Sequence, residues 1–398
     1  MNDQDWPFDK VIDRSETQSA KWEYFDKELL PLWVADMDFR VPQPIINAII
    51  QRAKHGIFGY SYYHDTYYDA VISWFKRHYN WEIDKEWLAF TPGVIPAINL
   101  AIQSFSHPGD KVVIQNPVYY PFFGAIQNNG RQILFNQLKL IDGRYKMDFD
   151  DLQLKLADPR AKIFILCNPH NPVGRVWNKE ELEQVGEICL KNRILIISDE
   201  IHCDLIYPEN NHTNFASISE DLALNSITCS SLSKTFNLAG LQLSNIIIPN
   251  PKLRKAFVNS IERVFIPEEF GYLPNNLSLV AFTAAYQECD GWLKSLLIYL
   301  QKNLRSLKSF IKTNIPQVKV IDPEGTYLVW LDFRNLGINY EQLDAFLKEN
   351  AKVVLDDGKK FGRGGEGFQR INIACPWSIL EEALQRIQRA IGEITSKP

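Results

Sequence analysis

The middle of the chain alternates short apolar runs, rich in β-branched residues, with longer amphipathic stretches. Runs that are apolar throughout, rather than at every second position, are typical of strands buried on both faces, and helix-length spacers are typical of parallel crossovers. We therefore predict a large, doubly wound, mostly parallel α/β domain, with sites where strands end and loops begin. The predicted strands are 111–115, 162–167, 193–198, 226–231 and 245–248, and the predicted helices include 94–105, 178–191 and 252–264.

The pattern changes after about residue 285. A long helical stretch precedes an alternating pair of strands, a helix, the run QRINIAC and a terminal helix, at 290–313, 318–333, 340–350, 369–375 and 378–394. This order is typical of a smaller α+β domain. We expect three parts: an N-terminal segment (1–44) that packs with the small domain, a large domain (45–285) and a small C-terminal domain (286–398).

Composition excludes several classes of protein. The 398 residues include 43 Lys and Arg against 48 Asp and Glu, a net charge of −5, so the chain lacks the basic balance of a nucleic-acid-binding protein. It has no apolar stretch of about 20 residues, and its polar, acidic start does not resemble a signal peptide. The six cysteines are scattered and form no CxxC pair, which favours free thiols in the cytoplasm over disulfides or a metal site.

Lys234 lies in the segment SSLSKTFNLAGLQ (230–242), where a strand runs into a short polar turn. A buried, unpaired lysine is costly because its charge must be desolvated. Such an amine has a lowered pKa and can form a Schiff base with a carbonyl compound. A lone lysine at a strand end is more often an ordinary surface residue, so the neighbouring motifs decide between the two interpretations.

Two other polar residues follow predicted strands. Asp199, in ILIISDEIHCD, comes directly after a predicted buried strand. A carboxylate there needs a cationic partner, such as a protonated pyridine nitrogen. The alternative is that Asp199 caps the N-terminus of a helix. Asn171 lies in CNPHNPVGRVW (167–177), a loop that two Asn-Pro pairs make rigid. Its amide can donate a hydrogen bond to a phenolate-like oxygen, or the loop can be purely structural.

Three further segments suit an anionic or aromatic ligand. Gly93, in FTPGVIPAINLAIQSF, precedes a helix whose free N–H groups can bind phosphate, and the hydroxyls of Ser231 and Ser233 can add donors. Tyr119, in NPVYYPFF, can stack on a planar ring. Arg370, in GFQRINIACP, which we expect to precede a strand, can pair with a substrate carboxylate. An ordinary helix start, core packing and a surface ion pair are the structural alternatives.

Taken in order, these motifs resemble those of pyridoxal-phosphate enzymes of the class I/II aminotransferase superfamily, which have the aspartate-aminotransferase fold. The order is TPG, NPxYxxF, NPHNPxG, SDEIH, SxSKTFNxxG and RINxxxP, over about residues 30–395. Within the superfamily the chain most resembles the MalY/PatB-type carbon–sulfur lyases, also called cystathionine β-lyases. This closer resemblance rests on LPLWVADMDF (30–39), FGYSYY (58–63), SDEIHCD (198–204) and the Lys234 segment.

The resemblance implies the cofactor pyridoxal 5′-phosphate and roles around its ring. Lys234 would be the Schiff-base lysine, and Asp199 would be the partner of the pyridine nitrogen. Asn171 would bind the phenolic oxygen, and Tyr119 would stack on the ring. His202 stands where aminotransferases usually have a tyrosine, as is usual in the lyase group.

The resemblance also implies the surroundings of the phosphate and the substrate. Arg370 would hold the α-carboxylate of an amino-acid substrate, with the backbone near Ala35 assisting. Tyr60 would reach the phosphate and substrate of a neighbouring subunit, so a homodimer with shared sites is implied. Aminotransferases usually have an Arg that binds the phosphate at the position where this chain has Gln242. The resemblance therefore does not tell which group balances the charge of the phosphate. The phosphate itself would be held by Ser231, Ser233, Gly93 and Val94.

Three functions compete at this point. The favoured one is β-elimination of L-cystathionine and related S-substituted cysteines, giving a thiol such as homocysteine, pyruvate and ammonia. An aminotransferase would differ only after the α-proton has been removed. A cofactor-binding regulatory or interaction protein is the third possibility, although every candidate catalytic position holds a competent residue type.

Overall fold

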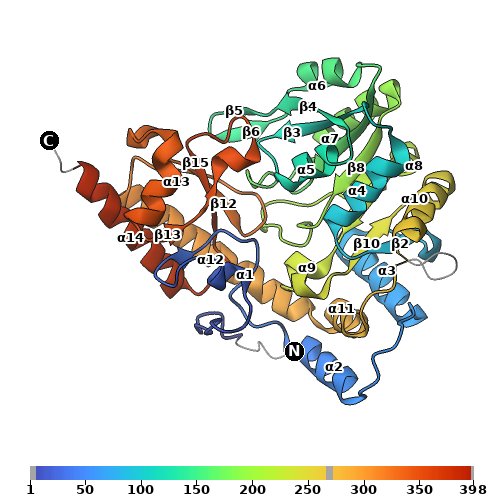
Figure 1. Ribbon diagram of the computed structural model, residues 1–398, viewed down its shortest axis with the longest axis horizontal. Coiled ribbons are helices and arrows are strands. Elements are labelled where there is room, and N and C mark those ends of the chain that lie inside the picture. The colour runs from blue at the N-terminus through green and yellow to red at the C-terminus, as the bar shows by residue number, and fades with distance from the viewer. Residues whose placement is uncertain (1–5, 266–271, 396–398) are drawn as a thin grey trace.

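The large sheet has seven strands and is parallel except at one place. The computed structural model describes residues 6–265 and 272–395 (Figure 1). Within these residues the strand order is β2-β10-β9-β8-β7-β3-β4, and β10 runs in the opposite direction to the other strands. The strands are β2 (Leu88–Thr91), β3 (Lys111–Asn116), β4 (Gln132–Gln137), β7 (Ala161–Cys167), β8 (Leu195–Asp199), β9 (Ser226–Ser230) and β10 (Ser244–Ile247). This confirms the predicted doubly wound, mostly parallel domain and all five of its predicted strands.

Helices cover both faces of this sheet, which explains the continuous apolar runs. Ile163 and Ile165 of β7 pack into one core with α4 (Val94–Phe105), α5 (Pro121–Gln127) and α10 (Pro251–Val264). Phe164 and Leu166 of the same strand point to the other face and pack with α6 (Phe149–Leu156) and α7 (Lys179–Asn192). Successive side chains of a strand alternate between faces, so a strand buried on both must be apolar at every position.

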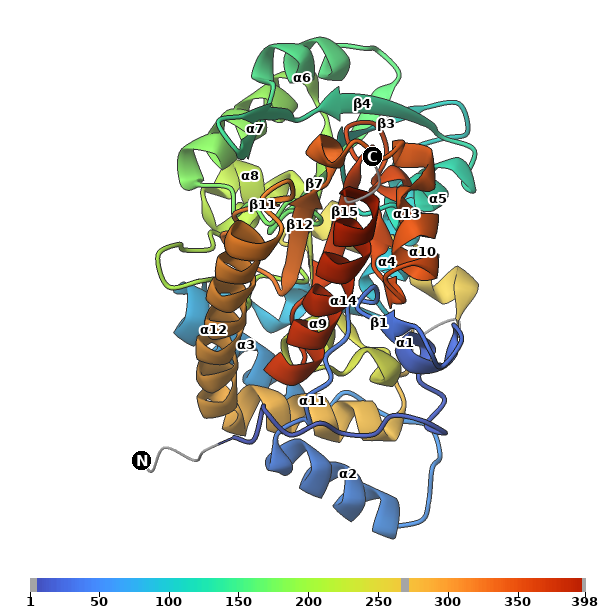
Figure 2. The ribbon, with the colours of Figure 1, turned by 90° about the vertical axis from the view of Figure 1, so that its left-hand side faces the viewer.

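The C-terminal part forms the predicted α+β arrangement. Its four-stranded antiparallel sheet has the order β11-β12-β15-β14 and lies beside helices α12 and α14, which run next to each other (Figure 2). The elements are α12 (Asp290–Asn314), β11 (Lys319–Ile321), β12 (Leu328–Asp332), α13 (Tyr340–Glu349), β14 (Asp356–Asp357), β15 (Phe368–Asn372) and α14 (Trp377–Thr395).

The N-terminal segment joins the two halves of the molecule. After α1 (Ala20–Glu23), β1 (Leu30–Pro31) pairs in parallel with β13 (Val353–Val354) of the C-terminal part (Figure 1). Farther along, α2 (Gln43–Lys54) and α3 (Asp65–Tyr79) contact α11 (Asn276–Glu288). Among the described residues, no helix has both the length and the apolarity to cross a membrane. The remaining α-helices and strands of the described residues are β5 (Lys139–Ile141), β6 (Arg144–Lys146), α8 (Glu220–Leu224) and α9 (Leu232–Thr235).

A buried glycine in the small domain provides a test of this packing. Gly358 follows β14, and a Cβ atom added there would lie 2.1 Å from the carbonyl oxygen of Gly365 and 2.5 Å from that of Phe368. Both obstacles are backbone atoms, so Gly358→Ala is expected to destabilise the fold by about 1–3 kcal/mol. The measurement is the shift of the thermal unfolding midpoint.

Gly291→Ala in α12 is the matched control, because nothing lies within 4 Å of a Cβ atom added there. Alanine favours a helix over glycine, so this variant is expected to unfold at the same or a slightly higher temperature. Equal midpoints for the two variants would contradict the packing described around Gly358.

Candidate active site

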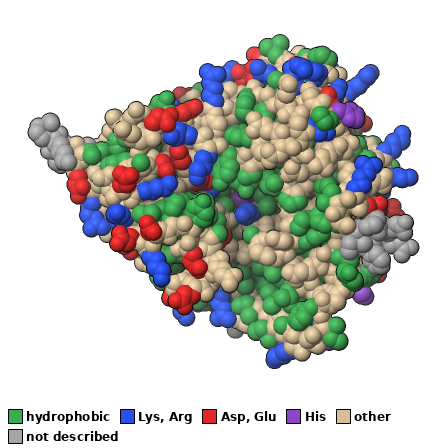
Figure 3. Space-filling view, viewed as in Figure 1, with side chains coloured by type: hydrophobic (Ala, Val, Ile, Leu, Met, Phe, Trp, Pro, Cys, Tyr) green, Lys and Arg blue, Asp and Glu red, His purple; other side chains and the backbone are tan. Residues whose placement is uncertain are grey.

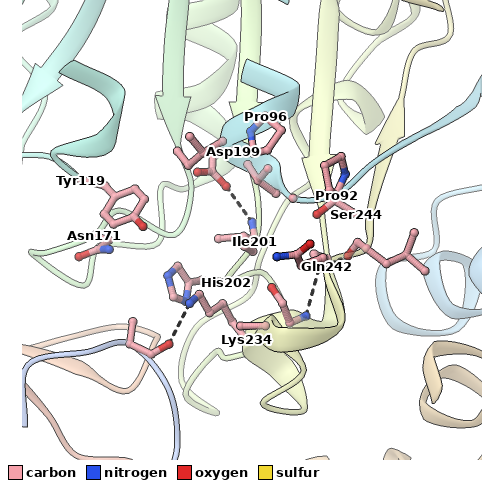
Figure 4. A pocket seen from close by; sticks show the side chains of 18 of the residues that line it. Pro92, Pro96, Tyr119, Asn171, Asp199, Ile201, His202, Lys234, Gln242 and Ser244 are labelled. Carbon is pink, nitrogen blue, oxygen red and sulfur yellow. Dashed lines mark hydrogen bonds between the residues drawn. The ribbon is translucent and has the colours of Figure 1, made fainter. Parts of the chain in front are cut away.

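A cavity of about 200 Å³ lies where the carboxyl ends of β7 and β8 meet the loops after β2 and β9 (Figure 4). The edge formed by the carboxyl ends of parallel strands is the usual place for a ligand in a doubly wound sheet. Figure 3 shows a hollow near the centre of this face of the molecule, with a basic side chain inside it. The cavity lining contains these sequence-predicted residues: Ala35, Gly93, Val94, Tyr119, Asn171, Asp199, His202, Ser231, Ser233, Lys234 and Gln242.

Lys234 lies in α9, a helix of four residues that starts directly after β9. The Ser231 hydroxyl caps this helix by accepting from the Ser233 N–H (3.1 Å). The Lys234 Nζ atom donates to the Ala35 carbonyl oxygen (2.8 Å). Burial lowers the pKa of Lys234 to about 8; the charges of Asp36 and Asp199 oppose this lowering and that of Arg370 adds to it. The amine is therefore neutral in a useful fraction of molecules near neutral pH.

Asp199 is the last residue of β8, and its side chain is buried. Its carboxylate accepts a hydrogen bond from the Ile201 N–H (3.1 Å). Within the described residues, no lysine, arginine or histidine forms an ion pair with it. Burial raises the pKa of Asp199 to about 7, although the charge of Lys234 partly offsets this rise. A buried carboxylate in this state favours a ligand that brings a cationic N–H group to the floor of the cavity.

Arg370 determines how the Asn171 amide faces the cavity. Its Nη1 atom donates to Asn171 Oδ1 (3.0 Å), so the Asn171 NH₂ group is left as a donor. Arg370 Nη2 donates to the Trp33 carbonyl oxygen (2.9 Å) and to Asp356 Oδ2 (2.6 Å). The expectation that Arg370 precedes a strand is wrong: it lies within β15, opposite Trp330, and its charge is tolerated there because these buried partners satisfy it.

Tyr119 and His202 complete the walls around Asn171 and Lys234 (Figure 4). Burial raises the pKa of Tyr119 to about 12, so its phenol stays protonated. Burial lowers the pKa of His202 to about 3, with smaller contributions from Lys234 and Arg370, so its imidazole stays neutral. The His202 Nδ1 atom is buried and has no hydrogen-bond partner within the described structure.

Neutral donors gather at the opposite end of the cavity. Helix α4 begins at Val94 with Gly93 as its N-cap, so its first N–H groups face this end. The Ser231 hydroxyl donates to the Leu243 carbonyl oxygen (2.7 Å), so its proton is already used in a bond within the fold. The other serine hydroxyls in the lining are those of Ser233 and Ser244. Among the described residues that line the cavity, Lys234 is the one Lys or Arg, and Gln242 supplies an uncharged amide.

Tyr60 lies apart from this cavity. It is 90% exposed, in the loop between α2 and α3, and lines two surface grooves instead. The same loop exposes three further large apolar side chains, Ile57, Phe58 and Tyr62. The structure therefore does not bring Tyr60 together with the other predicted site residues of the same chain.

Sequence reasoning missed two side chains near the cavity. Asp356 forms the ion pair with Arg370, and the Tyr327 hydroxyl donates to the Ala35 carbonyl oxygen (3.0 Å). Tyr327 lies within the apolar run TYLVWLDF and looks like an ordinary strand residue, so nothing in its local pattern marks it. Within the described ranges, no group of three or more His, Cys, Asp or Glu side chains is arranged to hold a metal ion.

Residues 27–387 match the family model "Aminotransferase class I and II". The chain is 44% identical to cystathionine beta-lyase PatB of Bacillus subtilis, over 97% of this chain and 100% of that protein. It is 36% identical to protein MalY of Escherichia coli, over 97% and 99% of the two chains. The crystal structure of cystalysin from Treponema denticola, which contains a pyridoxal 5′-phosphate cofactor, superposes with a TM-score of 0.94 at 39% identity, covering 98% of this chain and 99% of that chain. The chain therefore belongs to the class I and II aminotransferase family, and within it to the group that contains PatB and MalY.

Proposed function

We propose that the protein is a pyridoxal-phosphate-dependent carbon–sulfur β-lyase. Its substrates would be L-cystathionine and related S-substituted cysteines, and its products a thiol such as homocysteine, pyruvate and ammonia. The observation that carries this proposal is the pairing, in one cavity, of a buried carboxylate without a cation (Asp199) and a buried amine of lowered pKa (Lys234). The identity with PatB over nearly the whole chain supports the same choice.

The residues present fit this cofactor. Asp199 would accept from a protonated pyridine nitrogen, and the free NH₂ of Asn171 would donate to the phenolic oxygen. Tyr119 would stack on the ring. The N-terminus of α4, with Gly93 and Val94, would hold the phosphate, as helix N-termini commonly do.

Gln242 leaves that phosphate without a fixed cation from the lining. We propose that N–H and hydroxyl donors, chiefly those of α4 and Ser233, balance its charge instead. The hydroxyl of Tyr60 from a second copy would add one more donor.

When bound, the cofactor supplies an electron sink for the pair of electrons left when the Cα proton is removed. Lys234 would take that proton as general base, and a pKa near 8 suits this task at neutral pH. Asp199 would keep the ring nitrogen protonated, which requires its own carboxyl group to be ionised. His202, held neutral by burial, would bring no further charge next to Lys234.

Arg370 would orient the substrate through its α-carboxylate. Its Nε atom is buried and has no partner within the described structure, so it is a donor available to such a group. The ion pair with Asp356 and the bond to Asn171 would hold the guanidinium in place. This orientation would direct the Cα proton toward Lys234.

We further propose a cytoplasmic homodimer whose active sites are shared. The exposed apolar side chains around Tyr60 are better suited to a second copy than to water. All six cysteines lie in the described part of the chain and are buried and free, which supports a reducing compartment. We also propose the boundaries 1–44, 45–285 and 286–398 for the three parts of the chain.

The first prediction tests the reaction itself. The loaded protein incubated with L-cystathionine is expected to release pyruvate and free thiol in equal amounts. Lys234→Arg and Lys234→Ala are expected to reduce this release by at least about 10³-fold, because neither side chain provides a neutral amine. Pyruvate is measured by reduction and thiol by a colorimetric reagent.

A different pattern of products would overturn this assignment. A 2-oxo acid that appears only when an amino acceptor is present, without thiol, would identify an aminotransferase. Failure of the unmodified protein to take up pyridoxal phosphate would leave a regulatory or interaction role. Substantial pyruvate release by Lys234→Ala would remove that residue from the mechanism.

The second prediction concerns Asp199 and pH. Because its folded-state pKa is about 7 and its ordinary value is near 4, the folded chain without cofactor binds this proton more tightly than the unfolded chain. This tighter proton binding contributes fully to the free energy of unfolding below pH 4, and the contribution is lost as pH rises from 4 toward 7. Asp199→Asn does not ionise, so its stability relative to the unmodified chain is expected to rise over this window, at about 1.4 kcal/mol per unit of pKa difference.

Unfolding midpoints of the two cofactor-free proteins, measured between pH 4 and pH 8, test this expectation. Asp150→Asn removes an exposed carboxylate on the first turn of α6 and is a control whose change in stability should stay at about 1 kcal/mol or less. A stability difference between Asp199→Asn and the unmodified chain that does not depend on pH would contradict the uncompensated burial of Asp199.

The third prediction tests the shared site. Tyr60→Ala and Lys234→Ala are each expected to have little lyase activity, while an equal mixture, unfolded and refolded together, recovers up to about a quarter of the normal activity. In a mixed dimer, one site has both Lys234 and the partner's intact tyrosine. Recovery is followed as pyruvate release and the dimer as sedimentation. If the lyase activity of the refolded mixture does not exceed that of the two separate variants, Tyr60 does not act across subunits.

A further inference from the structure

Four consecutive backbone carbonyls, those of residues 33–36, accept hydrogen bonds from side chains that come from distant parts of the chain. Three of the four are bonded to side chains of β15. The carbonyl oxygen of Ala35 differs, because it accepts from both the Tyr327 hydroxyl (3.0 Å) and the Lys234 Nζ atom (2.8 Å). One backbone atom thus connects the reactive lysine of the large domain with a tyrosine of the small domain.

Tyr327 can act on the Ala35 carbonyl only as a donor. Its side chain is fully buried, and burial raises the pKa of its phenol far above the ordinary range, so the hydroxyl stays protonated. Its ring lies edge-on to that of His202, with 6.2 Å between the centroids. Tyr327 therefore touches two groups that surround Lys234 without lining the cavity itself.

The backbone before Tyr327 has a conformation that is held by its surroundings. Thr326 has φ = +68°, a region that a β-branched residue rarely adopts. Its N–H donates to the Leu205 carbonyl oxygen (2.6 Å), and its own carbonyl oxygen accepts from the Tyr207 hydroxyl (2.9 Å). Its hydroxyl accepts from the Leu328 N–H (3.1 Å). Strained residues persist where neighbouring contacts determine them fully, and here those contacts hold the backbone from which the Tyr327 side chain extends.

From this geometry we propose that Tyr327 is a positioning residue for Lys234: its hydroxyl holds the Ala35 carbonyl oxygen where the protonated amine of Lys234 needs an acceptor. The inference rests on the proposed function in one respect, since it takes Lys234 as the amine that reacts. Without the tyrosine hydroxyl, the Ala35 carbonyl oxygen loses one of its two hydrogen-bond donors and is no longer held in place. The charged amine of Lys234 then loses a well-placed acceptor.

Other charged groups also face Lys234 and act in opposite directions. Asp36 and Asp199 favour the protonated amine, and Arg370 disfavours it. His202 faces it as a neutral ring. All of these groups stay in place when only the Tyr327 hydroxyl is removed. A change in the protonation of Lys234 in Tyr327→Phe is therefore assigned to the Ala35 carbonyl.

The experiment measures the rate at which the cofactor-free, full-length chain captures pyridoxal phosphate, followed by visible absorbance as a function of pH. Capture requires the neutral amine, so the rate rises with pH through the pKa of Lys234. For Tyr327→Phe the midpoint is expected to move to lower pH by about half a unit, a threefold change in the proton dissociation constant. In the loaded enzyme we expect kcat to fall several-fold while KM changes less than twofold.

Tyr67→Phe is the matched control. Tyr67 is also buried and donates one hydrogen bond to an amide oxygen, but it lies on α3 and its acceptor is Asn245 (2.8 Å) and not Ala35. Its capture midpoint is expected to equal that of the unmodified protein. Tyr327→His keeps a ring N–H donor and is the second variant to test, which also serves if Tyr327→Phe does not fold. Its capture midpoint is expected to lie below that of the unmodified protein by less than half a pH unit. When both variants fold, its midpoint should therefore lie between those of Tyr327→Phe and the unmodified protein.

An unchanged or raised midpoint in the variant at Tyr327, or an equal shift in Tyr67→Phe, would overturn the proposal. These results differ from a failure of the proposed function. If Lys234 were not the reactive amine, Lys234→Ala would capture pyridoxal phosphate covalently and release pyruvate. The two inferences can thus fail separately.

Discussion

The guanidinium of Arg370 joins three separate parts of the chain behind Asn171, a residue that lines the cavity. It is 3% exposed and bonds to Asn171 of the large domain, Asp356 of the small domain and the carbonyl of Trp33 in the N-terminal segment. A buried cation is tolerated only when such partners surround it. The three parts must therefore assemble in one arrangement, and that arrangement also determines which end of the Asn171 amide faces the cavity.

The cavity itself concentrates groups that would be more stable elsewhere. Asp199 is buried without a cation, Lys234 is buried with a lowered pKa, and the N–H groups of α4 point into space that a ligand would fill. Each of these features costs folding free energy. A ligand with a cationic ring nitrogen, a carbonyl group and a phosphate would satisfy all three. Perturbed titratable groups that converge in one cavity are the usual physical mark of an active site.

The central strands could be predicted because burial on both faces leaves an apolar run that is hard to mistake. The short strand β2 and the edge strand β4 escaped this reasoning. In β4, with the sequence QILFNQ, the apolar run is only three residues long, and burial does not follow polarity: Phe135 is exposed and Asn136 is buried. The reversed direction of β10 also escaped it, because a strand buried on both faces has the same pattern in either direction. Arg370 lies within β15 although its charge interrupts an apolar run, and only its distant partners explain its burial.

The sequence by itself determined the fold class, the family and the residues expected to do the chemistry, because Lys234, Asp199 and Asn171 each lie in a local motif at the end of a strand. Only the tertiary structure decided which groups surround them. Ala35 is 199 residues from Lys234 and 292 residues from Tyr327, and the three meet at a single backbone oxygen. A backbone carbonyl is the same in every residue, so no pattern of side chains marks the one that folding places beside a reactive amine.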